Sequence, residues 1–192
     1  EGGPNRAPKF PLPNNYIFLL RFAHLKKDEA LMKHVLLTLD KMAMSGTYDQ
    51  LGGGFHRYST DDQWLVPHFE KMLYDNALLT ELYLEAYQAT QHLPYAKIAR
   101  EIIDYVSRDL KSPEGLFYST EDADSEGIEG KFYVWRQKEI EQQLGDDLAA
   151  IFCRVYSVTE AGNWEHQNIL HRTESFAELS AGLNLSESEL EE

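Results

Sequence analysis

Residues 51–77 (LGGGFHRYSTDDQWLVPHFEKMLYDNA) bring together side chains that can transfer protons and hold charge. The proline of this stretch suits the first turn of a helix, and a helix beginning there places His68, Lys71 and Asp75 at i, i+3 and i+7 on one face. His68, Glu70 and Asp75 would then transfer protons, and Lys71 would bind an anion or a developing negative charge. The alternative is structural: these side chains cap the helix and form ion pairs along it.

A second acidic stretch, residues 121–127 (EDADSEG), has the alternating carboxylates and the glycine of an EF-hand loop. The position that needs a bidentate glutamate is Tyr133, so the calcium motif is incomplete and we expect no metal site. Asp122 and Asp124 could instead face Asp61, Asp62 or Glu70 and supply the paired carboxylates that glycoside hydrolysis requires. A solvated acidic turn is the structural alternative.

Each of the three tryptophans of the chain lies in one of the long segments between expected helices. Beside carboxylates, flat rings can stack on a sugar while the polar groups bind its hydroxyls. We therefore expect Trp64, Trp135 and Tyr58 to bind a sugar, with burial beneath the loops as the structural alternative.

Composition narrows the class of protein. The chain has 192 residues, 43% of them hydrophobic, which is enough for a core, and its net charge of −14 disfavours nucleic acid and anionic membranes as partners. No apolar run is long enough for a membrane span, and no signal peptide is evident. The single cysteine, Cys153, excludes an internal disulfide and a Cys-rich zinc site, so we expect a cytoplasmic protein with no cofactor.

Hydrophobic periodicity predicts paired helices. We expect them near residues 14–27, 28–44, 67–90, 94–111, 136–144, 146–157 and 173–183, with Asp28 as the N-cap of the second. Residues 94–111 carry a single apolar stripe, and residues 67–90 should be buried on several sides. The three long connections, residues 45–67, 112–135 and 158–172, should share one rim. Strand-like runs within them predict two short hairpins, GGGFHRYS with QWLV and GLFYST with KFYVW.

Helix pairs with decorated loops on one rim predict an all-α fold of the (α/α) toroid type, with an open bundle or solenoid as the alternative. Three pairs cannot close a six-pair ring, so we expect half of one. The expected organisation is an extended segment at residues 1–13, a helical-hairpin domain at 14–183 and a solvated acidic tail at 184–192.

Several of these stretches resemble one family. LGGGFHRYSTDDQWLVPHFEKMLYDNA, PKFPLP upstream, and STEDADSEGIEGKFYVW and GNWEHQNIL downstream are similar to motifs of the DUF255 family, also called the YyaL-like or spermatogenesis-associated protein 20 family. In that family a thioredoxin-like domain precedes a six-hairpin (α/α) toroid similar to glycosidases and N-acylglucosamine 2-epimerases. The resemblance implies that this chain, which begins with Glu1 rather than Met, is the opening half of the toroid without the thioredoxin-like part.

Two functions follow as expectations. The first is a carbohydrate-binding or carbohydrate-active domain, a hydrolase or an epimerase, inactive as an isolated fragment. Its proton-transfer residues would be His56, His68, Glu70 and Asp75, and its sugar-binding residues Tyr58, Asp61, Trp64, Lys71, Asp122, Asp124 and Trp135. The second is a non-catalytic module that binds partners for the thioredoxin-like domain of the parent polypeptide. An incomplete ring would expose an apolar flank, so we also expect a homo-oligomer or a missing covalent remainder.

Overall fold

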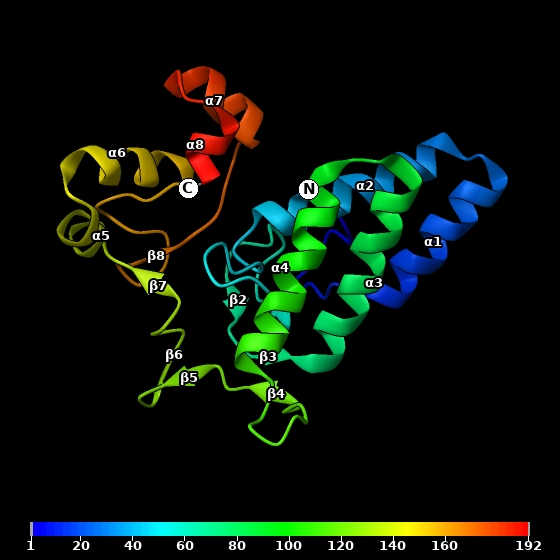
Figure 1. Ribbon diagram of the computed structural model, residues 1–192, viewed down its shortest axis with the longest axis horizontal. Helices are drawn as coiled ribbons and strands as arrows, with labels where there is room; N and C mark the ends of the chain where they lie inside the picture. The colour runs from blue at the N-terminus through cyan, green and yellow to red at the C-terminus, as the bar shows by residue number, and fades with distance from the viewer. Residues whose placement is uncertain (1, 192) are drawn as a thin grey trace. The chain divides into compact units, whose positions relative to one another are not determined.

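Helices form most of the regular structure of the protein (Figure 1). The computed structural model describes residues 2–191, which divide into two compact units, Glu1–Lys131 and Phe132–Glu192. The first unit contains α1 (Pro13–Lys26), α2 (Glu29–Met44), α3 (Leu73–Thr90) and α4 (Leu93–Asp109), and the second contains α5 (Gln137–Leu144), α6 (Asp146–Val155), α7 (Phe176–Leu183) and α8 (Glu187–Glu191).

The core of the first unit is built around α3, which packs against both α1 and α4. Because α3 is covered from more than one side, its buried residues do not form a single stripe, whereas those of α4 do. Both expectations from the sequence are confirmed. The aromatic residue Phe55 joins the core from the loop and stacks on Tyr83 of α3.

The two helices of each pair in the first unit are joined by tight turns. Lys27 has the left-handed conformation that ends α1, and the side chain of Asp28 accepts a hydrogen bond from the Leu31 amide at the start of α2, which confirms the predicted cap. α1 and α3 lie side by side and run in the same direction (Figure 1), linked by Arg21 of α1 with Glu81 and Glu85 of α3. The amino ends of these two helices therefore lie at the same end of the unit.

Four antiparallel pairs of two-residue strands organise the long loops. β1 (Tyr58–Ser59) pairs with β2 (Pro67–His68), β3 (Lys71–Met72) with β4 (Thr120–Glu121), β5 (Asp124–Ser125) with β6 (Ile128–Glu129), and β7 (Val134–Trp135) with β8 (Asn168–Ile169). The first predicted hairpin is confirmed only in part, because β1 lies in the GGGFHRYS run but its partner strand is Pro67–His68, just after QWLV. The second was wrong, because residues 120–121 pair with β3 and residues 134–135 pair with β8.

The predicted start of a helix near Pro67 was also wrong. Residues 67–72 are extended because β2 and β3 pair with other strands, and the helix begins at Leu73, whose amide donates to the carbonyl oxygen of Ser119. His68 and Lys71 therefore precede α3 instead of sharing a helical face with Asp75. Strand alternation sends their side chains to different environments, since His68 is half-exposed and Lys71 is buried.

The second unit has its own small core, formed by α5, α6 and the loop that follows them. Ile140, Ala149, Val158 and Leu170 are buried together. Asn168 braces the loop, since its amide donates to the carbonyl oxygens of Trp135 and Thr159 and its carbonyl accepts from the Thr159 amide. The helix expected at 173–183 is present as α7, and the segment expected to be a frayed acidic tail contains α8.

The three predicted helix pairs are all present, as α1–α2, α3–α4 and α5–α6. Eight helices with short antiparallel strand pairs, counted over residues 2–191, are compatible with a helical toroid. None of the helices in this range is both long and apolar enough to cross a membrane.

The loop before β1 depends on glycine, which gives a first prediction. Gly53 has φ +73°, and a Cβ added there would lie 2.7 Å from the carbonyl oxygen of Glu101. Gly53→Ala should therefore lower the free energy of unfolding by about 3 kcal/mol or more, from left-handed strain plus a clash with backbone that cannot move. Chemical denaturation measures the change.

Gly127→Ala is the matched control, because Gly127 has φ +76° and no atom within 4 Å of the added Cβ. Gly127→Ala should lower the free energy of unfolding by about 1–2 kcal/mol, which is the cost of the left-handed backbone conformation alone. Equal losses in the two variants would show that the close approach of Gly53 to α4 is not needed for stability.

Candidate functional site

Five charged or titratable side chains gather around the amino end of α3, and we call them the α3 cluster: Arg57, His68, Glu70, Asp75 and Glu129. Arg57 Nη1 lies 2.9 Å from Glu70 Oε2. His68 lies between two carboxylates, with Nε2 3.6 Å from Glu70 Oε2 and Nδ1 2.7 Å from Glu129 Oε1. All five residues belong to the first unit.

Backbone pairing places these side chains together. The Arg57 amide donates to the carbonyl oxygen of Glu70, and the β1–β2 register sets Tyr58 opposite His68. The β5–β6 hairpin brings Glu129 to His68 from about sixty residues further along the chain. The cluster is thus assembled by strand pairing between loops, with α3 supplying only Asp75.

Asp75 is the chemically unusual member of the cluster. It lies in the first turn of α3, is only 8% exposed, and has no hydrogen-bond donor among residues 2–191. Burial raises its pKa from 3.8 to about 6; Arg57 acts in the opposite direction, and Glu70 adds to the increase. A carboxyl group in this condition can take up and release a proton close to neutral pH, as a general acid or base must.

The guanidinium of Arg57 has a hydrogen-bond partner at Nη1 but none at Nε in the described part of the chain. Its hydrogen bond with Glu70 is the main reason that its pKa is raised, while its Nε atom is buried without an acceptor in the described part of the chain. Buried donors in folded proteins are nearly always paired, so an unpaired one next to an unpaired carboxyl is typical of a site that is not purely structural.

Aromatic side chains flank the α3 cluster. Tyr58 stacks on His68 with ring centroids 5.2 Å apart, and Phe10 stacks on Tyr58 at 4.7 Å. Tyr74, next to Asp75, is about half exposed. Flat partly exposed rings beside carboxylates can hold the apolar face of a ligand while the charged groups bind its polar substituents.

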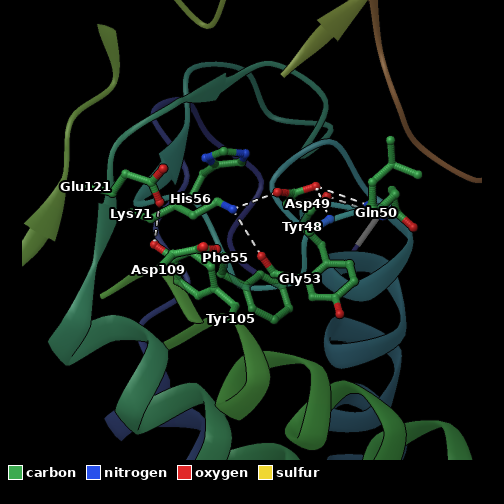
Figure 2. Close-up of polar contacts among 12 residues, drawn as sticks. Tyr48, Asp49, Gln50, Gly53, Phe55, His56, Lys71, Tyr105, Asp109 and Glu121 are labelled. Carbon is green, nitrogen blue, oxygen red and sulfur yellow. Dashed lines mark hydrogen bonds and ion pairs between the residues drawn. The ribbon is translucent and has the colours of Figure 1, made fainter. Parts of the chain in front are cut away.

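Figure 2 shows a buried ion pair, formed by Lys71 and Asp49. Lys71 Nζ contacts Asp49 Oδ2 at 2.7 Å and the carbonyl oxygen of Gly53 at 3.0 Å, and it lies 4.3 Å from the ring centroid of Tyr105. Tyr105 in turn donates to Glu121 on β4. Lys71 is only 1% exposed, so the sequence-predicted role in binding a substrate anion does not fit its position.

His56 belongs to this buried layer. Its Nδ1 lies 2.9 Å from the carbonyl oxygen of Phe69, and burial, assisted by the nearby Lys71 ammonium, lowers its pKa to about 3. The ring is therefore neutral at physiological pH and has no exposed surface from which to exchange a proton with a substrate. Its position supports a structural role in place of the predicted catalytic one.

Trp64 and Asp61 also support the loop itself. Trp64 is fully buried, donates from Nε1 to the carbonyl oxygen of Gly2, and has Lys9 above its ring, so it presents no face for stacking on a sugar. Both oxygens of Asp61 accept amides of its own loop, including that of Val66 at 2.6 Å. The positions of these two residues therefore agree with a structural role in the loop and not with sugar binding.

The acidic 121–127 stretch forms a strand hairpin in place of a calcium loop. Asp122 accepts the amide of Asp124, and β5 and β6 are joined by a tight turn. Asp124 is exposed. No group of three or more His, Cys, Asp or Glu side chains within residues 2–191 is arranged to hold a metal ion. Trp135 is half-buried against the core of the second unit.

The structure therefore joins three predicted proton-transfer residues, His68, Glu70 and Asp75, in one cluster with Tyr58 beside them. Glu129 and Tyr74 were missed. Glu129 lies in a generic acidic hairpin, and only the register of the strands reveals that it reaches His68. Tyr74 was not singled out in the sequence, and it is about half exposed in the first turn of α3.

The buried pair gives a stability prediction. Lys71→Met would leave Asp49 buried without its counter-ion, so the free energy of unfolding should fall by about 3–5 kcal/mol. Lys131→Met, which removes an exposed ion pair with Glu126, should change the denaturation midpoint very little. Adding Asp49→Leu to Lys71→Met should recover part of the loss, and a midpoint for Lys71→Met equal to that of Lys131→Met would contradict the assignment.

For Asp75, in contrast, we predict that a substitution raises the free energy of unfolding. Its folded-state pKa of about 6 lies above 3.8, so ionisation above pH 6 weakens the folded state, and protonation as the pH falls from 6 toward 4 removes that penalty. Asp75→Asn should therefore be more stable than the native chain by about 1–3 kcal/mol at pH 7.5, and by roughly half as much at pH 5.

Denaturation with urea at several pH values measures this difference, with Asp104→Asn as the control because Asp104 is exposed on α4. The control should show no comparable pH-dependent gain. A loss of stability in Asp75→Asn at pH 7.5 would mean that the carboxylate is a structural partner after all.

Comparison with known proteins places the chain among relatives that are much longer. No protein-family model matches it. It is 42% identical to spermatogenesis-associated protein 20 of Mus musculus and of Homo sapiens, and 35% identical to an uncharacterized protein of Caenorhabditis elegans, each over an alignment that covers 84% of this chain. The chain spans about a quarter of the length of these relatives, 23% to 25%. Over most of its length, the chain is a homologue of spermatogenesis-associated protein 20.

Proposed function

We propose that this chain is a carbohydrate-binding or carbohydrate-active helical domain whose acid–base group is Asp75. The observation that carries the proposal is a buried carboxyl without a hydrogen-bond donor among the described residues, held beside Arg57 and Glu70 at a helix end that aromatic rings flank. Carboxyl groups, an arginine and partly exposed tyrosines are the side chains that bind and activate sugars.

The two central carboxyl groups have different environments, and this suits them to different roles. Glu70 is paired with Arg57, whereas Asp75 is desolvated and has no donor within the described range. Such asymmetry lets one carboxyl transfer a proton while the other stabilises charge, as in glycoside hydrolysis. Asp75 with His68 would serve an epimerase instead, because epimerisation requires proton removal and return at one carbon.

The wider architecture is part of the same proposal. The three helix pairs would be the opening half of a six-hairpin (α/α) toroid of the DUF255 type, and the longer parent chain would also contain a thioredoxin-like domain. The relatives are about four times as long as this chain, which leaves room for both parts. We place the protein in the cytoplasm, expect the isolated half-ring to bind without turnover, and expect its open flank to favour a homo-oligomer.

One observation favours the non-catalytic alternative. The loop between α4 and β4 exposes three consecutive large apolar side chains, Leu116 at 72%, Phe117 at 49% and Tyr118 at 54%. Grouped exposed apolar residues are typical of a protein-binding surface. In this alternative the rim would bind a partner of the thioredoxin-like domain, and the α3 cluster would bind no sugar.

A ligand screen separates these functions. Thermal unfolding of the 192-residue chain should be measured with hexoses, amino sugars, N-acetylamino sugars, sugar phosphates, uronic acids and calcium. A ligand that binds only the folded state at 100 times its Kd adds about 2.7 kcal/mol of stability, so we expect a clear rise in Tm with at least one sugar and none with calcium.

Two substitutions and one control assign the effect to the site. Asp75→Asn and Tyr58→Ala should each abolish the rise in Tm, and Asp104→Asn should retain it. A rise that survives both site substitutions would place the sugar elsewhere on the protein. No rise with any sugar would overturn the carbohydrate proposal and favour the binding module.

A further inference from the structure

The α3 cluster contains more negatively charged side chains than positively charged ones, and this determines which ligands it can bind. It contains three carboxyl groups, those of Glu70, Asp75 and Glu129, and one permanent cation, Arg57, which Glu70 already neutralises. The neighbouring Lys71 contributes nothing to the surface, because it is buried and bonded to Asp49 and Gly53. His68 is hydrogen-bonded to Glu129. Asp75 and Glu129 are therefore both left without a permanent cation as an ion-pair partner in the cluster.

Asp75 has an unfilled capacity to accept hydrogen bonds. An ionised carboxylate accepts and never donates, and in residues 2–191 no donor reaches this one, while the residue as a whole is only 8% exposed. The positive end of α3 favours the anion but does not replace a donor, since Asp75 belongs to the first turn of that helix. A buried carboxylate of this kind is best satisfied by a charged N–H group, which supplies both the donor and the counter-charge.

The surroundings of Asp75 suit a cation better than an anion. Tyr74 is half exposed next to it and has a face available, whereas the two faces of Tyr58 are covered by Phe10 and His68. The faces of such rings attract an ammonium group. An anionic ligand would face Glu129 and Asp75 as well as the net charge of −14 on the whole chain.

We propose that the α3 cluster selects a ligand bearing a free ammonium group, which binds at the carboxylate of Asp75. This inference rests on the proposed carbohydrate function for its second half: with that function, the ligand is an amino sugar whose amine is not acylated. The ammonium donates to Asp75, the ring hydroxyls face Glu70 and Arg57, and the apolar face of the ring meets Tyr74.

The test is calorimetric titration of the 192-residue chain with four probes: glucosamine, N-acetylglucosamine, glucose and ethanolamine. We expect glucosamine to bind at pH 7 at least about tenfold more tightly than N-acetylglucosamine or glucose, because only glucosamine offers a charged donor. Since the folded-state pKa of Asp75 is about 6, affinity for glucosamine should fall about tenfold between pH 7 and pH 5 as the carboxyl is protonated.

Substitutions tie the effect to the cluster. Asp75→Asn should remove the preference for glucosamine and its pH dependence, and Glu129→Gln, a milder surface change, should weaken glucosamine by a few-fold only. Asp104→Asn should leave both unchanged. Circular dichroism and Tm of each variant confirm that it is folded.

The outcomes distinguish the inference from the function on which it rests. If N-acetylglucosamine and glucose bind as tightly as glucosamine, the ammonium inference is overturned and the carbohydrate function stands. If ethanolamine matches glucosamine, the ammonium site stands and the carbohydrate function does not. If none of the four probes binds, both are overturned.

Discussion

The ion pair between Lys71 and Asp49 is the interaction on which the rest of the first unit depends. A lysine that is 1% exposed is tolerated only where its charge is matched, and here a carboxylate, a carbonyl oxygen and the ring of Tyr105 surround it. Burial alone would raise the pKa of Asp49, but Lys71, helped by the Gly52 amide and by His56, lowers it overall, so the carboxylate stays charged. One contact thereby holds the glycine-rich loop, β3 and α4 together, and β3 is followed directly by α3, which carries Asp75 of the α3 cluster.

The side chains of this region divide by how fully their hydrogen-bonding groups are used. The side chain of Asn76 forms hydrogen bonds with both the amide and the carbonyl oxygen of Phe55. The carboxylate of Asp61 accepts hydrogen bonds from three amides of its loop, and the ring of Trp64 is buried with the ammonium of Lys9 above it. The fold itself therefore occupies the hydrogen-bonding groups of these side chains. Asp75 and the Nε atom of Arg57 have no such partners in the described residues, although they lie within the same structure. In a region where almost every polar group is matched, the two that are not are the ones with capacity left for a ligand.

The sequence predicted the helices well and the site only in part, for a physical reason. Helical periodicity is local, so the pairing of α1 with α2 and of α3 with α4, and the cap at Asp28, could be inferred from spacing. Two-residue strands leave no periodic signal, and their partners lie far along the chain, as with Lys71 and Glu121. That is why a helix was predicted at residues 67–72, and why the meeting of His68 with Glu129 was not foreseen. Chemical type alone could not separate His68 from His56 either, since burial decides which of them can reach a ligand.

Strand pairing also explains how adjacent residues supply both buried structural side chains and side chains that a ligand can reach. Along residues 68–71, His68 and Glu70 reach the cluster while Phe69 and Lys71 point into the core, because successive side chains of an extended segment face opposite sides. A helix at the same place would have spread these four side chains around one cylinder and mixed the two environments. The extended conformation lets the buried residues of this segment fix the backbone while the alternate ones stay available to a ligand. α3, beginning immediately afterwards, then adds Asp75 from a rigid element, so the cluster carboxyl whose pKa is raised is also the one that a helix positions.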